Sequence, residues 1–490
     1  MKIPIWKDMQ GKLIRDLSAS SAQVLLNHAL NLAIFYLTSR YLSKEIFGEL
    51  SWSLAGSAII IALLSFGLDL VVVKKIATGN DKRETAGLHL LHVLITAAIT
   101  GSLLLLLHLF FPLKGPLFVF LPGILISQLI SSLASPFKQI ANGTRSFAAL
   151  ALISVTSNIV KVVLLIVLLA FDILSIQYLI GLFIIASVIE LLTAIIITIS
   201  TQRKILLPVY FNWSRYRSLI REALPQYGVT IFNIVLARFD WIILGLLTSA
   251  VVTAEYSFAY RVFELCRLPL LILSPLLIPI FSRLFAQPAA LTAKKQVQLG
   301  LLFRTEMVLS LILPVLLISC WTPLMEFITN NKYGAGNEFV FILLAVCIPI
   351  QFATDFYWNI CFAKGQLAAT FRIAVISGLI NIVLNLLLIP FAGAMGAALA
   401  YLFCFIIQLV LFRRHNRRNN VQPDIFHFIK AVVAASAALV IAKLLTSSPW
   451  ITVLLSIPLY FLLCIFSKLI SLHKIKPALI LLLKQKRHYA

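Results

Sequence analysis

The chain has 490 residues, of which 61% are hydrophobic and only 12% are charged, and its mean hydropathy is +0.99. A soluble domain of this size could not bury so much apolar surface, which excludes a soluble enzyme or binding protein and makes lipid the solvent for most side chains. Lys and Arg outnumber Asp and Glu by 41 to 18. In a membrane protein such an excess first indicates which loops face the cytoplasm, rather than a nucleic-acid partner.

The first apolar run, near residues 19–40, is long enough to cross a membrane and follows a basic N-terminal segment. This pattern favours an uncleaved signal anchor over a cleaved signal peptide. Further apolar runs lie near 49–72, 88–111, 117–135, 149–170, 177–200, 224–247, 254–282, 299–320, 338–362, 373–390, 394–412, 425–445 and 450–470. Because a helix needs about 20 residues to cross the hydrocarbon, the sequence predicts an all-α membrane protein, a polytopic bundle of about fourteen transmembrane helices.

Basic residues gather in alternate loops. One side holds the basic N-terminal tail, Lys74/Lys75/Lys82/Arg83, Lys138/Arg145, Arg203/Lys204/Arg215/Arg217/Arg221, Arg283/Lys294/Lys295/Arg304, Lys364/Arg372, Arg413/Arg414/Arg417/Arg418 and the tail from Lys468. The opposite loops hold only Arg40, Lys44, Lys114 and Lys332. This asymmetry predicts a multi-pass membrane protein with both termini in the cytoplasm, and membrane topology alone can account for the basic loops.

The chain also reads as two similar halves separated by a basic linker. At a shift of 206 residues Asn27 meets Asn233 and Glu49 meets Glu255, and at a shift of 222 Gly143 meets Gly365. An even number of helices in each half predicts parallel repeats that insert the same way up. We therefore predict an N-lobe over 1–205 (helices 1–6), a C-lobe over 206–422 (helices 7–12, with the linker 206–223), and an accessory C-terminal hairpin and basic tail over 423–490.

Six charged residues fall near the middle of predicted helices, where each costs roughly 2.5–3.5 kcal/mol on insertion scales. They are Lys161, Glu190, Arg238, Arg261, Glu264 and Arg267. The last three follow at i, i+3 and i+6 and should share a helix face. They could form internal ion pairs, Glu264 with its arginines and Glu190 with Lys161. The four cations nevertheless exceed the two acids, which suits a watery cavity that binds phosphate, because Arg offers bidentate donors.

A polar stripe marks the seventh predicted helix, where Gln226, Asn233 and Asp240 recur every seventh residue and share a face within ~40°. The stripe could line a cavity or make hydrogen bonds between helices in lipid, and the sequence leaves both open. The remaining membrane acids are expected near helix ends, within reach of water. They are Asp69, Asp172, Glu306 and Asp355.

No nucleotide-binding or hydrolase motif is present. The chain has no G-x-x-x-x-G-K-[ST], H-E-x-x-H or G-x-S-x-G segment, and its six cysteines lie in apolar runs without metal-ligand spacing. We therefore expect no catalytic residue, metal or cofactor. Energy would come from a proton or Na⁺ gradient, the membrane potential or substrate supply.

Several segments resemble a known family. Phe47-Gly48-Glu49-Leu50-Ser51, Arg238-Phe239-Asp240-Trp241 and Asn385-Leu-Leu-Leu-Ile-Pro390-Phe-Ala-Gly393-Ala-Met-Gly396 occur in an order and spacing similar to those of polysaccharide transporters, the O-antigen flippases of the Wzx type. That family lies within the multidrug/oligosaccharidyl-lipid/polysaccharide exporter (MOP) superfamily. The resemblance extends to about residue 420 and leaves the C-terminal hairpin outside it.

The resemblance implies a transporter and not an enzyme, with two six-helix lobes, a cationic lumen and alternating access. Its substrate would be undecaprenyl-diphosphate carrying an O-antigen (lipopolysaccharide), capsule or exopolysaccharide unit. Membrane lipids, a polysaccharide polymerase and a chain-length regulator would be its partners. The substrate-binding candidates are Arg238, Arg261, Arg267 and Lys161, and the candidates for ion coupling or pairing are Glu190, Asp240 and Glu264. A cation-coupled multidrug exporter and a membrane polysaccharide polymerase or ligase are the alternatives.

Overall fold

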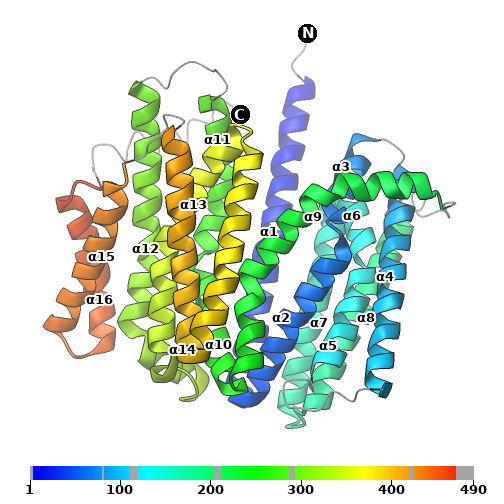
Figure 1. The fold of residues 1–490 in the computed structure, drawn as a ribbon, viewed down its shortest axis with the longest axis horizontal. Coiled ribbons are helices and arrows are strands. Elements are labelled where there is room, and N and C mark those ends of the chain that lie inside the picture. Colours follow the sequence, from blue (N-terminus) through cyan, green and yellow to red (C-terminus); the bar gives the residue numbers. More distant parts are fainter. Residues whose placement is uncertain are drawn as a thin grey trace. The chain divides into compact units, whose positions relative to one another are not determined.

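The computed structural model describes residues 4–79, 82–110, 120–202, 211–285, 293–418 and 424–470, with most of their side chains. Over these residues the chain is helical and has no strand (Figure 1). Ten of the helices are long and apolar enough to cross a membrane. The predicted all-α polytopic membrane fold is therefore confirmed.

The chain divides into two compact units, Met1–Gly245 with Ser249–Ala254, and Leu246–Thr248 with Glu255–Ala490. Unit 1 contains α1 (Pro4–Tyr41), α2 (Lys44–Ser65), α3 (Leu68–Thr78), α4 (Lys82–Phe110), α5 (Leu121–Leu133), α6 (Ser135–Gly143), α7 (Phe147–Ala170), α8 (Ile176–Gln202) and most of α9 (Trp213–Leu247). Unit 2 contains most of α10 (Ala250–Cys266), then α11 (Leu268–Phe285), α12 (Ala293–Thr329), α13 (Glu338–Ala363), α14 (Leu367–Arg418), α15 (Phe426–Leu445) and α16 (Pro449–Phe466). The assignment of residues 206–245 to a C-lobe stays a prediction that rests on the repeat in the sequence.

Several predicted spans are broken helices. Between α2 and α3 the backbone takes left-handed angles at Phe66 and Gly67, with φ of 48° and 66°. Gly67 is required there because a Cβ atom would lie 2.6 Å from the backbone nitrogen of Tyr227. Single residues without left-handed angles, Ala134 and Arg267, separate α5 from α6 and α10 from α11. Some of the fourteen predicted spans are therefore single long helices, and others are pairs of shorter helices separated by these breaks.

The long helix α14 is a helical hairpin. Gly393 interrupts it with φ 52° and ψ −127°. The Cys404 thiol donates to the Ser377 carbonyl at 3.2 Å, so the two halves lie side by side. This reversal separates the two spans predicted at 373–390 and 394–412.

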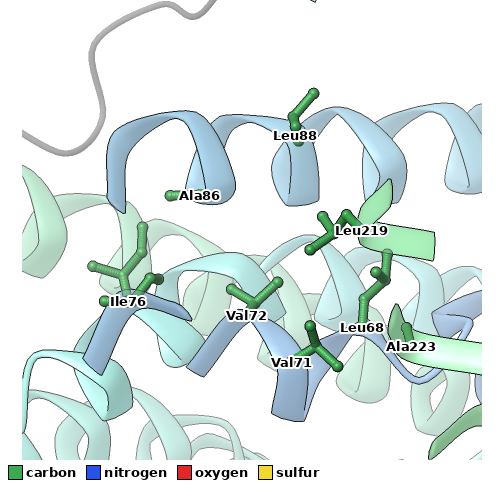
Figure 2. Close-up of a cluster of buried hydrophobic side chains, with 9 residues drawn as sticks. Leu68, Val71, Val72, Ile76, Ala86, Leu88, Leu219 and Ala223 are labelled. Atoms are coloured by element: carbon green, nitrogen blue, oxygen red, sulfur yellow. The ribbon is translucent and has the colours of Figure 1, made fainter. Parts of the chain in front are cut away.

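Helix α9 consists of two parts. Its 35 residues contain Pro225 in the interior, and a proline there removes a backbone hydrogen bond and bends the helix. Figure 1 shows the first part running across the ends of α3 and α4 before the helix turns to run alongside α2. Leu219 and Ala223 from this first part join a buried apolar cluster with residues of α3 and α4 (Figure 2).

In unit 2 the C-terminal hairpin of α15 and α16 packs on α12. The Ser319 and Ser456 hydroxyls lie 2.9 Å apart, and the Tyr460 hydroxyl donates to the Val308 carbonyl at 3.0 Å. The hairpin is therefore attached to unit 2 by buried polar contacts as well as by apolar packing.

Candidate functional site

Unit 1 holds a buried charge cluster around Glu190, on α8. This side chain is only 3% exposed. Its carboxylate forms an ion pair with the Lys138 amine on α6 and accepts a hydrogen bond from the Ser131 hydroxyl on α5 at 2.9 Å. Three helices therefore meet at one carboxylate, which is compensated as a buried charge must be.

Lys161, on α7, belongs to the same cluster. Its amine lies 5.4 Å from the centre of the Phe183 ring and interacts electrostatically with Glu190 and Lys138. The direct ion pair of Glu190 is with Lys138, a residue that the sequence analysis placed in a loop. The cluster thus contains two basic side chains and one acid.

The polar residues of α9 differ in their surroundings. Asp240 is 2% exposed, and its carboxylate accepts the backbone N–H of Trp241 at 2.9 Å. The Arg238 guanidinium lies 4.6 Å from the centre of the Trp241 ring, a cation–π contact. Gln226 is half-buried and Asn233 is exposed. The predicted stripe therefore passes from buried surface at Asp240 to exposed surface at Asn233.

In unit 2 the three charges of the eighth predicted helix lie around the junction of α10 and α11. Arg261 Nη1 donates to Glu264 Oε2 at 2.9 Å, and both side chains are partly exposed. Arg267 follows the end of α10, and its guanidinium lies 5.8 Å from the Phe263 ring centre. Arg261 and Glu264 lie on α10, and Arg267, one residue past its end, still interacts electrostatically with Glu264.

Arg267 reaches a polar group that sequence reasoning missed. It interacts electrostatically with Tyr401, Tyr260, Glu264 and Asp355. The Gln351 amide donates to the Tyr401 hydroxyl at 2.8 Å. On α13, Asp355 accepts from the Asn359 amide at 2.9 Å. These residues come from α10, α13, α14 and the residue between α10 and α11, so no spacing in the sequence would have grouped them.

The expectation that Glu306 and Asp355 lie near helix ends is wrong. Helix α12 extends to Ala293, so Glu306 lies more than three turns inside it and is only 4% exposed. Neither of its carboxyl oxygens has a hydrogen-bond partner among the described residues, and Asp355 is an electrostatic neighbour. The predicted span was too short, which moved the acid to an apparent end. Asp172, in contrast, is exposed and follows α7, as expected.

A second group that the sequence did not reveal surrounds two histidines of α4. Asp69, in the first turn of α3, accepts hydrogen bonds from Ser135 at 2.6 Å and Gln139 at 3.1 Å, and His89 Nε2 lies 3.6 Å away. One turn later, His92 contacts the Leu64 carbonyl through Nε2 at 2.9 Å and the Tyr216 hydroxyl through Nδ1 at 2.8 Å. Because a carbonyl can only accept, His92 Nε2 donates to it, while Nδ1 shares its hydrogen bond with the tyrosine hydroxyl.

Within the described residues, no three His, Cys, Asp or Glu side chains come together as a metal site. The six cysteines are buried free thiols. What the charged groups can do together is bind anions through surplus Lys and Arg, and exchange protons or cations at carboxylates.

Comparison with known proteins finds one matching family and several solved structures of the same fold. A family model described as "Polysaccharide biosynthesis protein" matches residues 13–285, more than half of the chain. The lipid II flippase MurJ, in an inward closed conformation, is similar with a TM-score of 0.72 at 17% identity, covering 92% of this chain and 98% of that one. An inward-facing multidrug resistance transporter of the MATE family and MOP superfamily gives 0.65 at 12% identity, covering 81% and 98%.

A MOP superfamily transporter from Pyrococcus furiosus gives a TM-score of 0.56 at 12% identity, with 83% of this chain and 95% of that one covered. No curated protein sequence matches the chain. At these identities the structural likeness shows the fold, which is that of the MurJ and MATE transporters.

Proposed function

Because the chain belongs to the polysaccharide biosynthesis protein family, we propose that it is a flippase that moves undecaprenyl-diphosphate-linked oligosaccharide from the cytoplasmic to the periplasmic leaflet of the bacterial inner membrane. The transporter fold that it shares with a lipid II flippase supports this proposal. The relatives of the same fold are transporters and flippases rather than enzymes. An O-antigen, capsule or exopolysaccharide unit is the proposed cargo.

The chemistry of such a substrate sets what the protein must supply. A sugar head group loses its hydrogen bonds to water in hydrocarbon, and each unsatisfied hydroxyl costs several kcal/mol. The polyprenyl tail is apolar and can stay in lipid. A protein that carries the head group across therefore needs polar side chains at membrane depth, and cations among them for the diphosphate.

The observation that carries the proposal is the presence of Lys and Arg side chains inside both units, with two cations to one acid in the Glu190 cluster of unit 1. In unit 1, Lys138 and Lys161 share one acid, Glu190. In unit 2, Arg261 has Glu264 as its ion-pair partner, and Arg267 adds a second guanidinium beside tyrosines. We propose that Arg238, Arg261, Arg267 and Lys161 bind the diphosphate and the sugar, and that alternating access exposes them to each leaflet in turn.

Coupling to a proton or Na⁺ gradient belongs to the same proposal. Such an ion biases transport only if it binds the two conformations with different affinity. Glu190 and Glu264 are engaged by Lys138 and Arg261, and Asp240 accepts a backbone N–H. Ion binding at any of the three would therefore exchange one partner for another during the cycle.

The test compares alanine variants of the two unit 2 arginines. We expect Arg261→Ala and Arg267→Ala to abolish surface polysaccharide in cells and transport of lipid-diphosphate oligosaccharide in proteoliposomes, with normal membrane insertion. Arg261→Lys and Arg267→Lys separate charge from bidentate geometry. Full glycan export by the Arg261→Ala/Arg267→Ala double variant would defeat the proposal.

A multidrug exporter is the second candidate, because the MATE transporters share the fold. Cationic drugs favour an acidic binding site, whereas the Glu190 cluster of unit 1 has two cations to one acid. Drug-resistance assays on overexpression separate the two, since the flippase proposal expects no gain in resistance. Formation of new glycosidic linkages by the purified protein would instead indicate a polymerase or ligase.

A further inference from the structure

The first part of α9, residues 213–224, forms what we call the linker helix. Helix α9 is 35 residues long, or about 52 Å at 1.5 Å per residue, whereas the hydrocarbon is about 30 Å thick. The residues after Pro225 suffice to span it. The linker helix is therefore surplus to the membrane crossing, and its bend away from the rest of α9 is visible in Figure 1.

One face of the linker helix is fixed to unit 1 by apolar packing. Leu219 and Ala223 are 3% and 0% exposed. Figure 2 shows Leu219 and Ala223 beside Leu68 of α3, with Leu88 of α4 across from Leu219. This inner face gives the helix a defined position on the ends of α3 and α4.

Polar contacts fix the rotation of the linker helix about its axis. Arg215 Nη1 lies 3.3 Å from Glu84 Oε2, and Glu222 Oε2 lies 2.9 Å from the Lys75 amine. Such partly exposed ion pairs contribute little to stability. Because they lie on the flanks of the inner face, they determine which residues point outward.

The outer face carries aromatic and cationic side chains. Trp213, Arg217 and Arg221 recur at i, i+4 and i+8, which places them along one side of the helix. All three are exposed, Trp213 by 63%. Phe211, 50% exposed, lies 6.1 Å from the Trp213 ring. Tryptophan and arginine side by side are typical of helices that lie in the head-group region of a membrane.

The surroundings of this face are strongly basic. Across 74–84 and 211–222 the basic residues are Lys74, Lys75, Lys82, Arg83, Arg215, Arg217 and Arg221, and the acids are Asp81, Glu84 and Glu222. A pocket of about 320 Å³ opens between the two segments and is lined in part by Lys74, Thr78 and Arg215. Positive charge of this density complements an anionic surface.

We propose that the outer face of the linker helix docks on the anionic phospholipid head groups of the leaflet on the side of the basic loops. Trp213 and Phe211 would enter the boundary between head groups and acyl chains, and Arg217 and Arg221 would contact lipid phosphates. Each basic residue near an anionic surface contributes about 1 kcal/mol, close to fivefold in affinity. The inference concerns membrane lipids and stands independently of the transported substrate.

A fluorescent label on the linker helix tests the docking directly. Ser214 is exposed and lies beside the outer face, while the six native cysteines are buried, so Ser214→Cys can be labelled selectively with an environment-sensitive dye. We expect the dye on the full-length protein to shift to the blue in nanodiscs containing phosphatidylglycerol, relative to phosphatidylcholine alone, and the shift to shrink in high salt. Equal spectra in the two lipids would overturn the proposal.

Removing two positive charges from the outer face provides a second test of the docking proposal. We expect Arg217→Gln/Arg221→Gln to bind phosphatidylglycerol about twenty-five-fold more weakly, measured as lipid retained in native mass spectrometry of the purified protein. The matched comparison is Arg414→Gln/Arg417→Gln, which removes two exposed cations at the end of α14 on the side of the basic loops and should lose clearly less lipid than the linker variant. If the linker variant retained as much phosphatidylglycerol as the wild type, or if inorganic phosphate displaced the lipid, docking on a lipid surface would be refuted.

Discussion

Two buried glutamates, one in each unit, have different polar partners around them. Glu190 in unit 1 and Glu306 in unit 2 both lie well inside long helices and are 3% and 4% exposed. Glu190 has a lysine partner and a hydroxyl donor. Glu306 has no hydrogen-bond partner among the described residues and has the acid Asp355 as an electrostatic neighbour. A compensated acid joins helices together, whereas an uncompensated one costs stability, so its presence calls for a role other than stability.

The largest effect is expected from Glu190→Met. This change leaves Lys138 and Lys161 beside each other without their acid, and breaking a buried pair from one side costs about 3 kcal/mol or more. Thermal unfolding of the purified protein in detergent measures the loss. The double variant Glu190→Met/Lys138→Met should recover part of it, because one stranded cation is removed with the acid. A loss below about 1 kcal/mol would mean that the cluster is not structural.

A smaller loss is expected from Ser131→Ala, which removes only the hydroxyl donor to Glu190. A hydrogen bond to a charged group contributes about 1.5–3 kcal/mol, and the Lys138 pair remains, so we expect a loss near the lower end of that range. Ser132→Ala is the matched control, because the Ser132 hydroxyl donates to the Leu129 carbonyl of its own helix. Equal losses in the two variants would show that the bond to Glu190 has no special weight.

Glu306→Met should act in the opposite direction and raise stability by about 1 kcal/mol. The substitution keeps the volume and removes a buried carboxyl that has no donor, which relieves its desolvation cost. We expect this more stable variant to transport more slowly in proteoliposomes, because a destabilising acid is retained when transport needs it. A variant that is less stable than the wild type would reveal that the carboxyl is compensated, and the contrast with Glu190 would disappear.

The sequence predicted the membrane segments well and their internal breaks poorly. Hydropathy is a local property, so the spans could be placed from composition, including the two halves of α14. The left-handed turn at Phe66–Gly67 depends on close approach to Tyr227, far away in the chain, and no local pattern reports such an approach.

The candidate site shows the same division between local and tertiary information. Lys161, Glu190 and Arg267 were found as charges in apolar runs, because a charge in lipid is conspicuous in any sequence. Only some of their partners were predicted: Lys161 with Glu190 and Arg267 with Glu264 were, whereas Lys138 and Asp355 were not. Lys138 was counted as a loop cation, and Asp355 was placed at a helix end, since the partners of each charge come from other helices and are set by packing.

The smallest effect is expected at Glu222 of the linker helix, an acid that is compensated but partly exposed. Its carboxylate lies 2.9 Å from the Lys75 amine and 3.7 Å from the Lys74 amine, and 37% of its side chain is exposed. Water screens such pairs, so Glu222→Gln should change the free energy of unfolding by at most about 0.5 kcal/mol. A double-mutant cycle with Lys75→Gln measures the coupling. A coupling above about 2 kcal/mol would make this exposed pair as strong as the buried Glu190 pair. Having a cationic partner, rather than being buried, would then decide how much an acid of this protein contributes to stability.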